Sequence, residues 1–211
     1  YGIFKPLPKC SDLVDKLKIK GRKTILTISR LAERKGHDIV LKALPLVLKS
    51  IPNLSYLIVG EGPYRTHLME LCRELKLDSV VTFIGFAYDE ELVMYYNLCD
   101  VFVMPNREIF NSTDSVEGFG ITFIEANACN KPVIGGRSGG AIEAVKDGVT
   151  GFLVDPQNEN EVAEKIIFLL QDEELARKMG KDGRKRVEKD FSWEKRAYEL
   201  AEQLTKEALK V

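Results

Sequence analysis

The sequence contains few cysteines, and their spacing excludes a metal site built on them. Cys10, Cys72, Cys99 and Cys129 form neither a CxxC motif nor a Cys/His metal spacing. The last three lie in apolar runs, as buried free thiols do. We therefore expect unpaired thiols and a reducing, cytoplasmic compartment.

Long apolar runs and an excess of one charge are also absent. No run comes near the roughly 18 residues of a membrane-spanning helix, and no signal peptide is recognisable. The 31 basic and 32 acidic side chains leave a formal net charge of −1, which gives no general attraction to nucleic acid or to an anionic membrane. Phosphate binding must therefore come from local groups, while attachment to a membrane surface stays open.

What the sequence does contain is a regular alternation of strand and helix patterns. Between residues 24 and 170, short β-branched segments alternate with longer helical ones, which is typical of βαβ units around a parallel sheet. We predict an α/β fold with a Rossmann-like, doubly wound sheet of about six strands, at Thr24–Ser29, Leu54–Val59, Val80–Ile84, Val101–Met104, Pro132–Ile134 and Gly151–Val154. Helices are predicted near residues 37–50, 64–76, 89–97, 120–129, 140–146 and 159–170, and Pro45 should kink or shorten the first.

The two ends of the chain differ from this alternating region, residues 24–170. Residues 1–22 include prolines and show no strong periodicity, so we interpret them as a linker into the first strand. Beyond residue 171 the pattern is that of a charged helix, with Gly180 and Gly183 as weak points. A break at residues 191–193 precedes a final helix whose apolar face needs a partner surface.

The most informative segment is EGFGITFIE at residues 117–125, where a glycine-broken loop runs into an apolar helix. Its glycines allow a ligand to approach the backbone, and the N–H groups and dipole of the helix start attract anions. Glu117 lies in the loop and Glu125 within the helix. If both face one cleft, they flank an anion site with groups that prefer hydroxyls to phosphates. We therefore predict a site for a nucleotide sugar.

Two cations are expected at the carboxyl edge of the sheet, where open α/β sheets bind ligands. Arg30 follows the first strand and Lys35 precedes the next helix. Together they could neutralise a diphosphate, Arg30 as a bidentate fork and Lys35 as a point charge. The alternative is a pair of solvated loop cations, which are common on protein surfaces.

Three further segments are less specific. The turn VGEGP at residues 59–63 lacks the third glycine of a dinucleotide fingerprint, so Gly62 serves either a tight turn or the approach of a ligand. The long polar segment 106–116 is either a lip over the site or a disordered insertion. The second glycine loop, within residues 134–143, suits another wall of the cleft, with Glu143 as a helix-dipole charge.

The two histidines and a basic cluster have structural interpretations. His37 and His67 have no Ser or Cys nucleophile at an obvious partner position, so both are expected to be structural. The cluster at residues 184–189 is interpreted as the wet face of a helix, and contact with a membrane surface is the alternative.

Taken in order, these motifs resemble those of the retaining glycosyltransferases of the GT-B fold, family 4 (glycosyltransferases group 1). The resemblance covers nearly the whole chain and depends most on Glu117 and Glu125 downstream of Arg30 and Lys35. It also includes the segments IGF at residues 84–86 and GxxGFLV at residues 148–154.

The resemblance implies an organisation into halves. The chain would be the carboxyl-terminal, donor-binding half of such an enzyme. Residues 1–22 would be the interdomain hinge, residues 23–190 the nucleotide-sugar-binding domain and residues 191–211 a crossover helix. That last helix would pack on the missing amino-terminal acceptor domain or pair between copies of the chain as a homodimer.

The resemblance also implies a role for each matching residue. Arg30, Lys35 and Glu117 would be catalytic: the two cations would stabilise the departing nucleotide in place of a metal, and Glu117 would bind hydroxyls of the transferred sugar. No cofactor or metal is expected. The donor would be a UDP- or GDP-hexose, held further by Gly62, Ile84, Phe86, Phe119, Gly120, Ile121 and Glu125. Among these, Ile84 to Phe86 would meet the base and Glu125 the ribose.

Transfer with retention to a hydroxyl of a glycan or lipid acceptor is the activity that the resemblance implies, and the half alone should bind donor without transferring it. Nucleic acid is not an expected partner, and the location would be cytoplasmic or peripheral at a membrane. Two alternatives remain at this point: a noncatalytic nucleotide-binding regulatory module, and a nucleotide-sugar epimerase. A gain in affinity from the sugar that depends on Glu117 would separate the transferase from the regulatory module.

Overall fold

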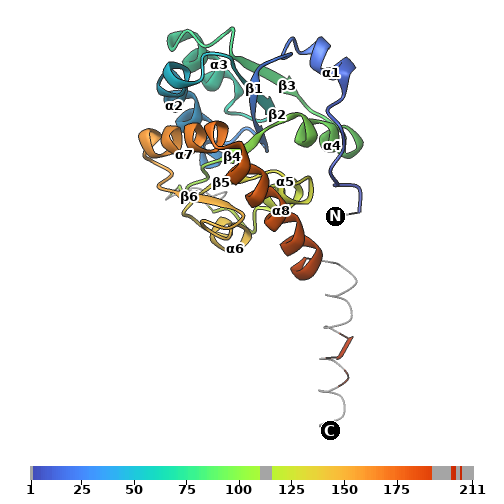
Figure 1. The fold of residues 1–211 in the computed structure, drawn as a ribbon. Helices are drawn as coiled ribbons and strands as arrows, with labels where there is room; N and C mark the ends of the chain where they lie inside the picture. Colours follow the sequence, from blue (N-terminus) through green and yellow to red (C-terminus); the bar gives the residue numbers. More distant parts are fainter. Residues whose placement is uncertain (1, 110–115, 192–200, 203–204, 206–211) are drawn as a thin grey trace.

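The computed structural model describes residues 2–109, 116–191, 201–202 and 205. Six parallel strands form one sheet in the order β3-β2-β1-β4-β5-β6 (Figure 1). The strands are β1 Lys23–Ile28, β2 Leu54–Val59, β3 Val81–Gly85, β4 Val101–Met104, β5 Val133–Gly136 and β6 Gly151–Val154. The predicted α/β fold class and all six predicted strands are confirmed.

Helices cover both faces of this sheet. They are α1 Ser11–Lys16, η1 Glu33–Lys35, α2 His37–Ser50, α3 Arg65–Glu74, α4 Asp89–Leu98, α5 Ile121–Ala128, α6 Ala141–Ala144, α7 Glu159–Gln171 and α8 Glu173–Asp190. Because successive strand residues point to opposite faces, Ile25 lies in one hydrophobic core with α2, α3 and α7. Leu26 lies in the other with α4, α5 and Val187 of α8. Both faces are apolar, so the strands read as continuous buried runs.

Pro45 does not shorten α2, which extends over its whole predicted length. The proline and its neighbour Leu46 lie on the exposed side of the helix, while Leu44 and Val47 remain in the core. Of the two predicted effects, shortening does not occur, because burial of the apolar side offsets the loss of one backbone donor. A kink at Pro45 stays a prediction.

The amino-terminal segment is more structured than its composition indicated. It contains helix α1, and Phe4 and Ile19 are buried in the core. Asn97 of α4 fixes the backbone on both sides of Pro6, because its amide donates to the Lys5 carbonyl at 3.0 Å and accepts from Leu7 N at 2.8 Å. These first residues therefore pack on the domain.

Gly180 and Gly183 are not weak points, since α8 runs through both without a break. Both are buried, and a β-carbon at Gly180 would collide with the carbonyl of Asn130. At Gly183 a β-carbon would lie 2.6 Å from the side chain of Asn127. The glycines let α8 pack against the end of α5, and this tertiary packing outweighs their low helix propensity.

The predicted final helix, the break at residues 191–193 and the long segment 106–116 lie largely outside the described residues. Within the part of the chain that the structure describes, no helix has the length and apolar character needed to cross a membrane.

Candidate functional site

Lys35 and Glu117, 82 residues apart in the sequence, form an ion pair at the carboxyl edge of the sheet. Lys35 ends the short η1 turn after β1, and Glu117 precedes α5. Arg34 Nη1 also lies 3.2 Å from Glu117 Oε2. The side chains of Lys35 and Glu117 are each only 10% exposed, so this is a buried cluster. The structure thus brings together two of the three residues predicted to be catalytic.

The loop of Glu117 is fixed by the second glycine loop. Gly140 N donates to the Glu117 carbonyl at 2.8 Å, and a β-carbon at Gly139 would lie 2.6 Å from the same oxygen. Gly120 begins α5 in the left-handed conformation, with φ of 76°, which glycine adopts without strain. The two loops predicted to wall one cleft are therefore packed against each other.

The start of α5 carries exposed side chains beside this cluster. Phe119 is 40% exposed and Ile121 is 60% exposed, whereas Gly120 between them is buried. The first N–H groups of an α-helix have no partner within the helix. The start of α5 thus lies next to Glu117, and anion binding there stays a prediction.

Arg30, the third residue predicted to be catalytic, follows β1 with an exposed side chain. Backbone hydrogen bonds hold the turn that carries it: Leu31 N donates to the Glu61 carbonyl at 2.8 Å, and the Leu31 carbonyl accepts from Tyr64 N at 3.0 Å. A β-carbon at Gly62 would collide with that Leu31 carbonyl. Close packing of two loops therefore explains Gly62, and its contact with a donor stays a prediction.

The end of β3 joins the same edge. Gly60 N donates to the Gly85 carbonyl at 2.7 Å, and Ile84 beside it is half-buried. Phe86 is 65% exposed and packs edge-on against Tyr88 with ring centres 5.1 Å apart. An exposed aromatic pair at a strand end offers a surface on which a planar base can stack.

Glu125 contacts α4. Tyr96 Oη donates to Glu125 Oε2 at 2.7 Å. Burial raises the pKa of Glu125, and the hydrogen bond from Tyr96 opposes that shift without cancelling it. A ribose hydroxyl would have to replace or join Tyr96 at this carboxylate, so the predicted ribose role remains a prediction.

Sequence reasoning missed several residues of the edge. Arg34 was passed over because surface arginines carry no distinctive pattern, although its position beside Lys35 was a usable signal. Arg107 pairs with Asp38 in a buried ion pair, and only the fold shows that these residues meet. Tyr96 lies in a predicted helix, and nothing in the sequence pattern indicated that it contacts Glu125.

His37 has a serine partner that the sequence pattern did not indicate, and the structural role expected of both histidines stays a prediction. His37 is buried, and Ser29 Oγ lies 3.2 Å from its Nε2. Burial lowers the pKa of His37 to about 3, so the ring is neutral at physiological pH. His67 stacks on Tyr64 with ring centres 4.6 Å apart.

The basic cluster of α8 is only partly a wet face. Arg184 donates to the carbonyls of Phe4 and Ala128 at 2.9 and 2.7 Å. Arg186 donates to those of Glu143 and Ala144 at 2.6 Å each. The interpretation of these two arginines as solvated was wrong, because they bind carbonyls of neighbouring segments. The side chain of Lys185 is 76% exposed, which agrees with a solvated helix face at that position.

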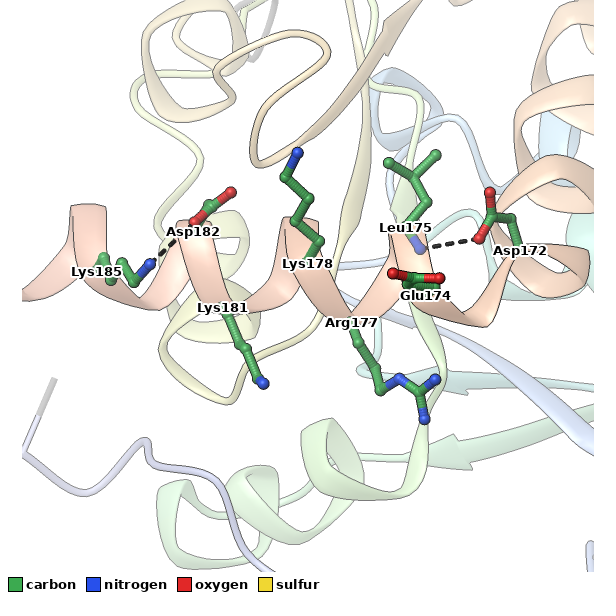
Figure 2. Close-up of a pocket in the computed structure, with 8 residues that line it drawn as sticks. All are labelled: Asp172, Glu174, Leu175, Arg177, Lys178, Lys181, Asp182 and Lys185. Atoms are coloured by element: carbon green, nitrogen blue, oxygen red, sulfur yellow. Dashed lines mark hydrogen bonds and ion pairs between the residues drawn. The ribbon is translucent and has the colours of Figure 1, made fainter.

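A hollow of about 610 Å³ runs along α8 and contains none of the predicted site residues. Figure 2 shows Lys178 extending on one side of the helix and Arg177 and Lys181 on the other. Asp182 pairs with Lys185 at 3.3 Å, and Asp172 caps the start of α8. Both signs of charge mix here, so we interpret this hollow as part of a solvated helix face.

The fold and the edge cluster define a class of protein: a Rossmann-like α/β domain of the kind found in GT-B glycosyltransferases. The family model for glycosyl transferases group 1 matches residues 11–186. The chain therefore belongs to the glycosyl transferases group 1 family.

Curated relatives agree with this family assignment. The GDP-mannose-dependent alpha-(1-6)-phosphatidylinositol monomannoside mannosyltransferase of Mycobacterium tuberculosis is 38% identical over 94% of the chain and 52% of its own length. A monoacylated-substrate counterpart from Corynebacterium glutamicum is 39% identical over 79% of the chain and 42% of its own length. The chain thus spans about half the length of the curated relatives it matches.

Solved structures give the same result. HepE of Anabaena in complex with UDP has a TM-score of 0.86 at 26% identity, over 97% of the chain and 55% of that protein. The C-terminal domain of a glycosyl transferase group 1 family protein, LpcC, from Francisella tularensis has a TM-score of 0.78 at 26% identity. The matched region covers 91% of the chain and 97% of that domain.

Proposed function

We propose that this chain is the donor-binding half of a retaining family 4 mannosyltransferase that uses GDP-mannose and a lipid-linked mannoside. The observation that carries the proposal is the buried cluster of Lys35, Arg34 and Glu117 beside the start of α5. It places cations suited to a diphosphate against a carboxylate suited to sugar hydroxyls. The choice of GDP-mannose and of a lipid acceptor follows the names of the mycobacterial and corynebacterial relatives.

The chemistry would proceed as an exchange of partners at Lys35. The donor diphosphate takes the ammonium of Lys35, with Arg30 as a second cation, and the start of α5 adds N–H donors. Glu117 then accepts hydrogen bonds from sugar hydroxyls. The bond from sugar C1 to the phosphate oxygen breaks, and a bond from C1 to the acceptor oxygen forms on the same face. The acceptor proton leaves with the departing diphosphate, whose charge Lys35 and Arg30 stabilise without a metal.

Calorimetry with GDP-mannose, GDP and UDP-glucose tests the proposal on this chain. Lys35→Ala and Arg30→Ala should each weaken GDP-mannose binding by about 1.5 to 3 kcal/mol, the range for a lost charged hydrogen bond. Glu117→Ala should remove the added affinity that the sugar gives over GDP alone. EDTA should leave all three affinities unchanged.

Three outcomes would contradict it. Unchanged affinity in both cation variants would remove Lys35 and Arg30 from the site. Equal binding of GDP and GDP-mannose by the wild-type chain would favour the noncatalytic nucleotide-binding module. Tighter binding of UDP-glucose than of GDP-mannose would keep the site and overturn the donor. Lys185→Ala, at an exposed side chain of α8 paired with Asp182, is the matched control for loss of one cation.

A further inference from the structure

A buried arginine, Arg107, binds the turn that carries Lys35. Its Nη1 lies 2.9 Å from Asp38 Oδ1 and its Nη2 lies 3.1 Å from Asp38 Oδ2. This is the two-point geometry in which guanidinium and carboxylate bind most directionally. The two side chains are only 9% and 6% exposed, so water does not loosen the pair.

Arg107 also contacts the turn on the other side of Lys35. Its backbone N donates to the Arg34 carbonyl at 2.8 Å, and its Nη2 lies 3.4 Å from Glu33 Oε1. Residues 33, 34 and 38 are thus all bound by one residue, and Lys35 lies between them. The turn therefore cannot move without breaking contacts of Arg107 on both sides of Lys35.

The backbone beneath the turn belongs to the same segment as Arg107. Gly36 has φ of 73°, and a β-carbon there would collide with the Pro105 carbonyl. Asn106 Nδ2 donates to the Ser138 carbonyl at 3.0 Å and its Oδ1 accepts from Gly136 N at 3.2 Å. Residues 105–107 therefore join the turn of Lys35 to the glycine loop that holds Glu117.

A buried ion pair adds little net stability, because the cost of removing two charges from water offsets their attraction. What it does supply is a fixed geometry. From these contacts we propose that Arg107 is a positioning residue, which sets donor affinity by holding Arg34 and Lys35 against Glu117. The inference deepens the proposed function and rests on it.

A double-mutant cycle on GDP-mannose binding tests this role. Arg107→Gln should weaken affinity roughly tenfold, within the range of coupling between neighbouring residues. In a Lys35→Ala background the same change should have a much smaller effect, because only Arg34 is then left of the two cations that Arg107 holds. The same loss in both backgrounds would mean that Arg107 matters only for general stability and would overturn the proposal.

Arg184→Gln is the matched control. It also removes a largely buried guanidinium that binds carbonyls, but on α8, away from the Lys35 turn. It should lower the melting temperature and leave GDP-mannose affinity unchanged. An equal loss of affinity in Arg184→Gln would also overturn the positioning role.

Hydrogen exchange on the ligand-free chain separates this inference from the proposed function. Arg107→Gln should speed amide exchange in residues 33–36 more than in strand β2, and Arg184→Gln should not. Unchanged exchange at residues 33–36 sinks the positioning role even if GDP-mannose binds well. Faster exchange in a chain that binds no nucleotide sugar keeps the mechanical role of Arg107 and rejects its effect on a donor.

Discussion

At the scale of single residues, Glu117 contacts two cations at once. Lys35 and Arg34 both contact the same carboxylate, so the proposed donor would have to compete for them. A diphosphate offers more charge and more acceptor oxygens than one carboxylate, which favours the exchange. The carboxylate so released is next to the anion and can turn to hydroxyls. The same contact therefore pairs both cations and places a hydrogen-bond acceptor, the Glu117 carboxylate, beside the proposed diphosphate site.

His37 makes stability depend on pH in the acidic range. Its pKa is about 3 in the folded chain against 6.5 for an ordinary histidine, chiefly because of burial. The unfolded chain therefore binds the proton first, and stability present above 6.5 is lost as the pH falls toward 3. Between about pH 7.5 and about pH 5 the loss from His37 should be about 2 kcal/mol.

Urea unfolding at these two pH values measures that loss. His37→Gln should show a shallower fall in the free energy of unfolding than the wild-type chain. His67→Gln, at an exposed position, is the control and should keep the wild-type slope. Equal slopes in all three proteins would show that His37 accepts a proton in the folded state.

At the scale of elements, helix α8 shows how packing decides what a glycine does. Its exposed side is charged, and its buried side includes Met179, Gly180, Gly183 and Val187. The glycines admit the backbone of Asn130 and the side chain of Asn127. Asn127 in turn donates to the carbonyls of Lys131 and Thr150 at 2.9 and 3.3 Å. The helix therefore packs on the last turn of α5 and the residues that follow it, where the Asn127 amide is already hydrogen-bonded.

Gly180→Ala should destabilise the chain, although alanine is the better helix former by about 1 kcal/mol. The added methyl meets a backbone carbonyl, which cannot rotate away, and forced overpacking costs about 1 to 3 kcal/mol. The net expectation is a lower melting temperature in a thermal scan. Lys181→Ala, on the exposed side of the same helix, should change it little. A higher melting temperature for Gly180→Ala would show that α8 moves away without cost.

At the scale of the whole molecule, the carboxyl ends of β1, β3 and β4 gather the candidate site at one edge, as open parallel sheets do. The chain spans about half of its curated relatives, whereas the C-terminal domain of LpcC matches it nearly end to end. The proposed donor site and an acceptor site would then belong to different halves. Binding and transfer should be separable on that division.

This chain by itself should bind GDP-mannose but transfer no mannose to a lipid-linked mannoside. Binding needs only the cluster around Lys35 and Glu117, while transfer needs an acceptor oxygen held within reach of C1. Calorimetry and a radiolabelled transfer assay on one preparation measure both. Transfer by this chain alone would contradict the division of roles and place the acceptor site within these residues.

Much of the fold could be predicted because its signals are local. β-Branched runs gave the strands, and the glycine loop before Ile121 gave the helix start. Pairing across distance could not be predicted in the same way. Nothing near Arg107 indicates Asp38, 69 positions earlier, and nothing near Tyr96 indicates Glu125. The arginines at 184 and 186 looked solvated because their partners are carbonyls of other segments.

The sequence by itself determined the order of strands and helices, the parallel sheet and the residue types gathered at its carboxyl edge. It did so because hydrophobic period and glycine position act over a few residues. Only the tertiary structure decided that Lys35 pairs with Glu117, that Arg107 binds the turn that carries Lys35, and that Gly180 packs against the backbone of Asn130. Those contacts join segments far apart in the chain, and their geometry exists only once both faces of the sheet are covered.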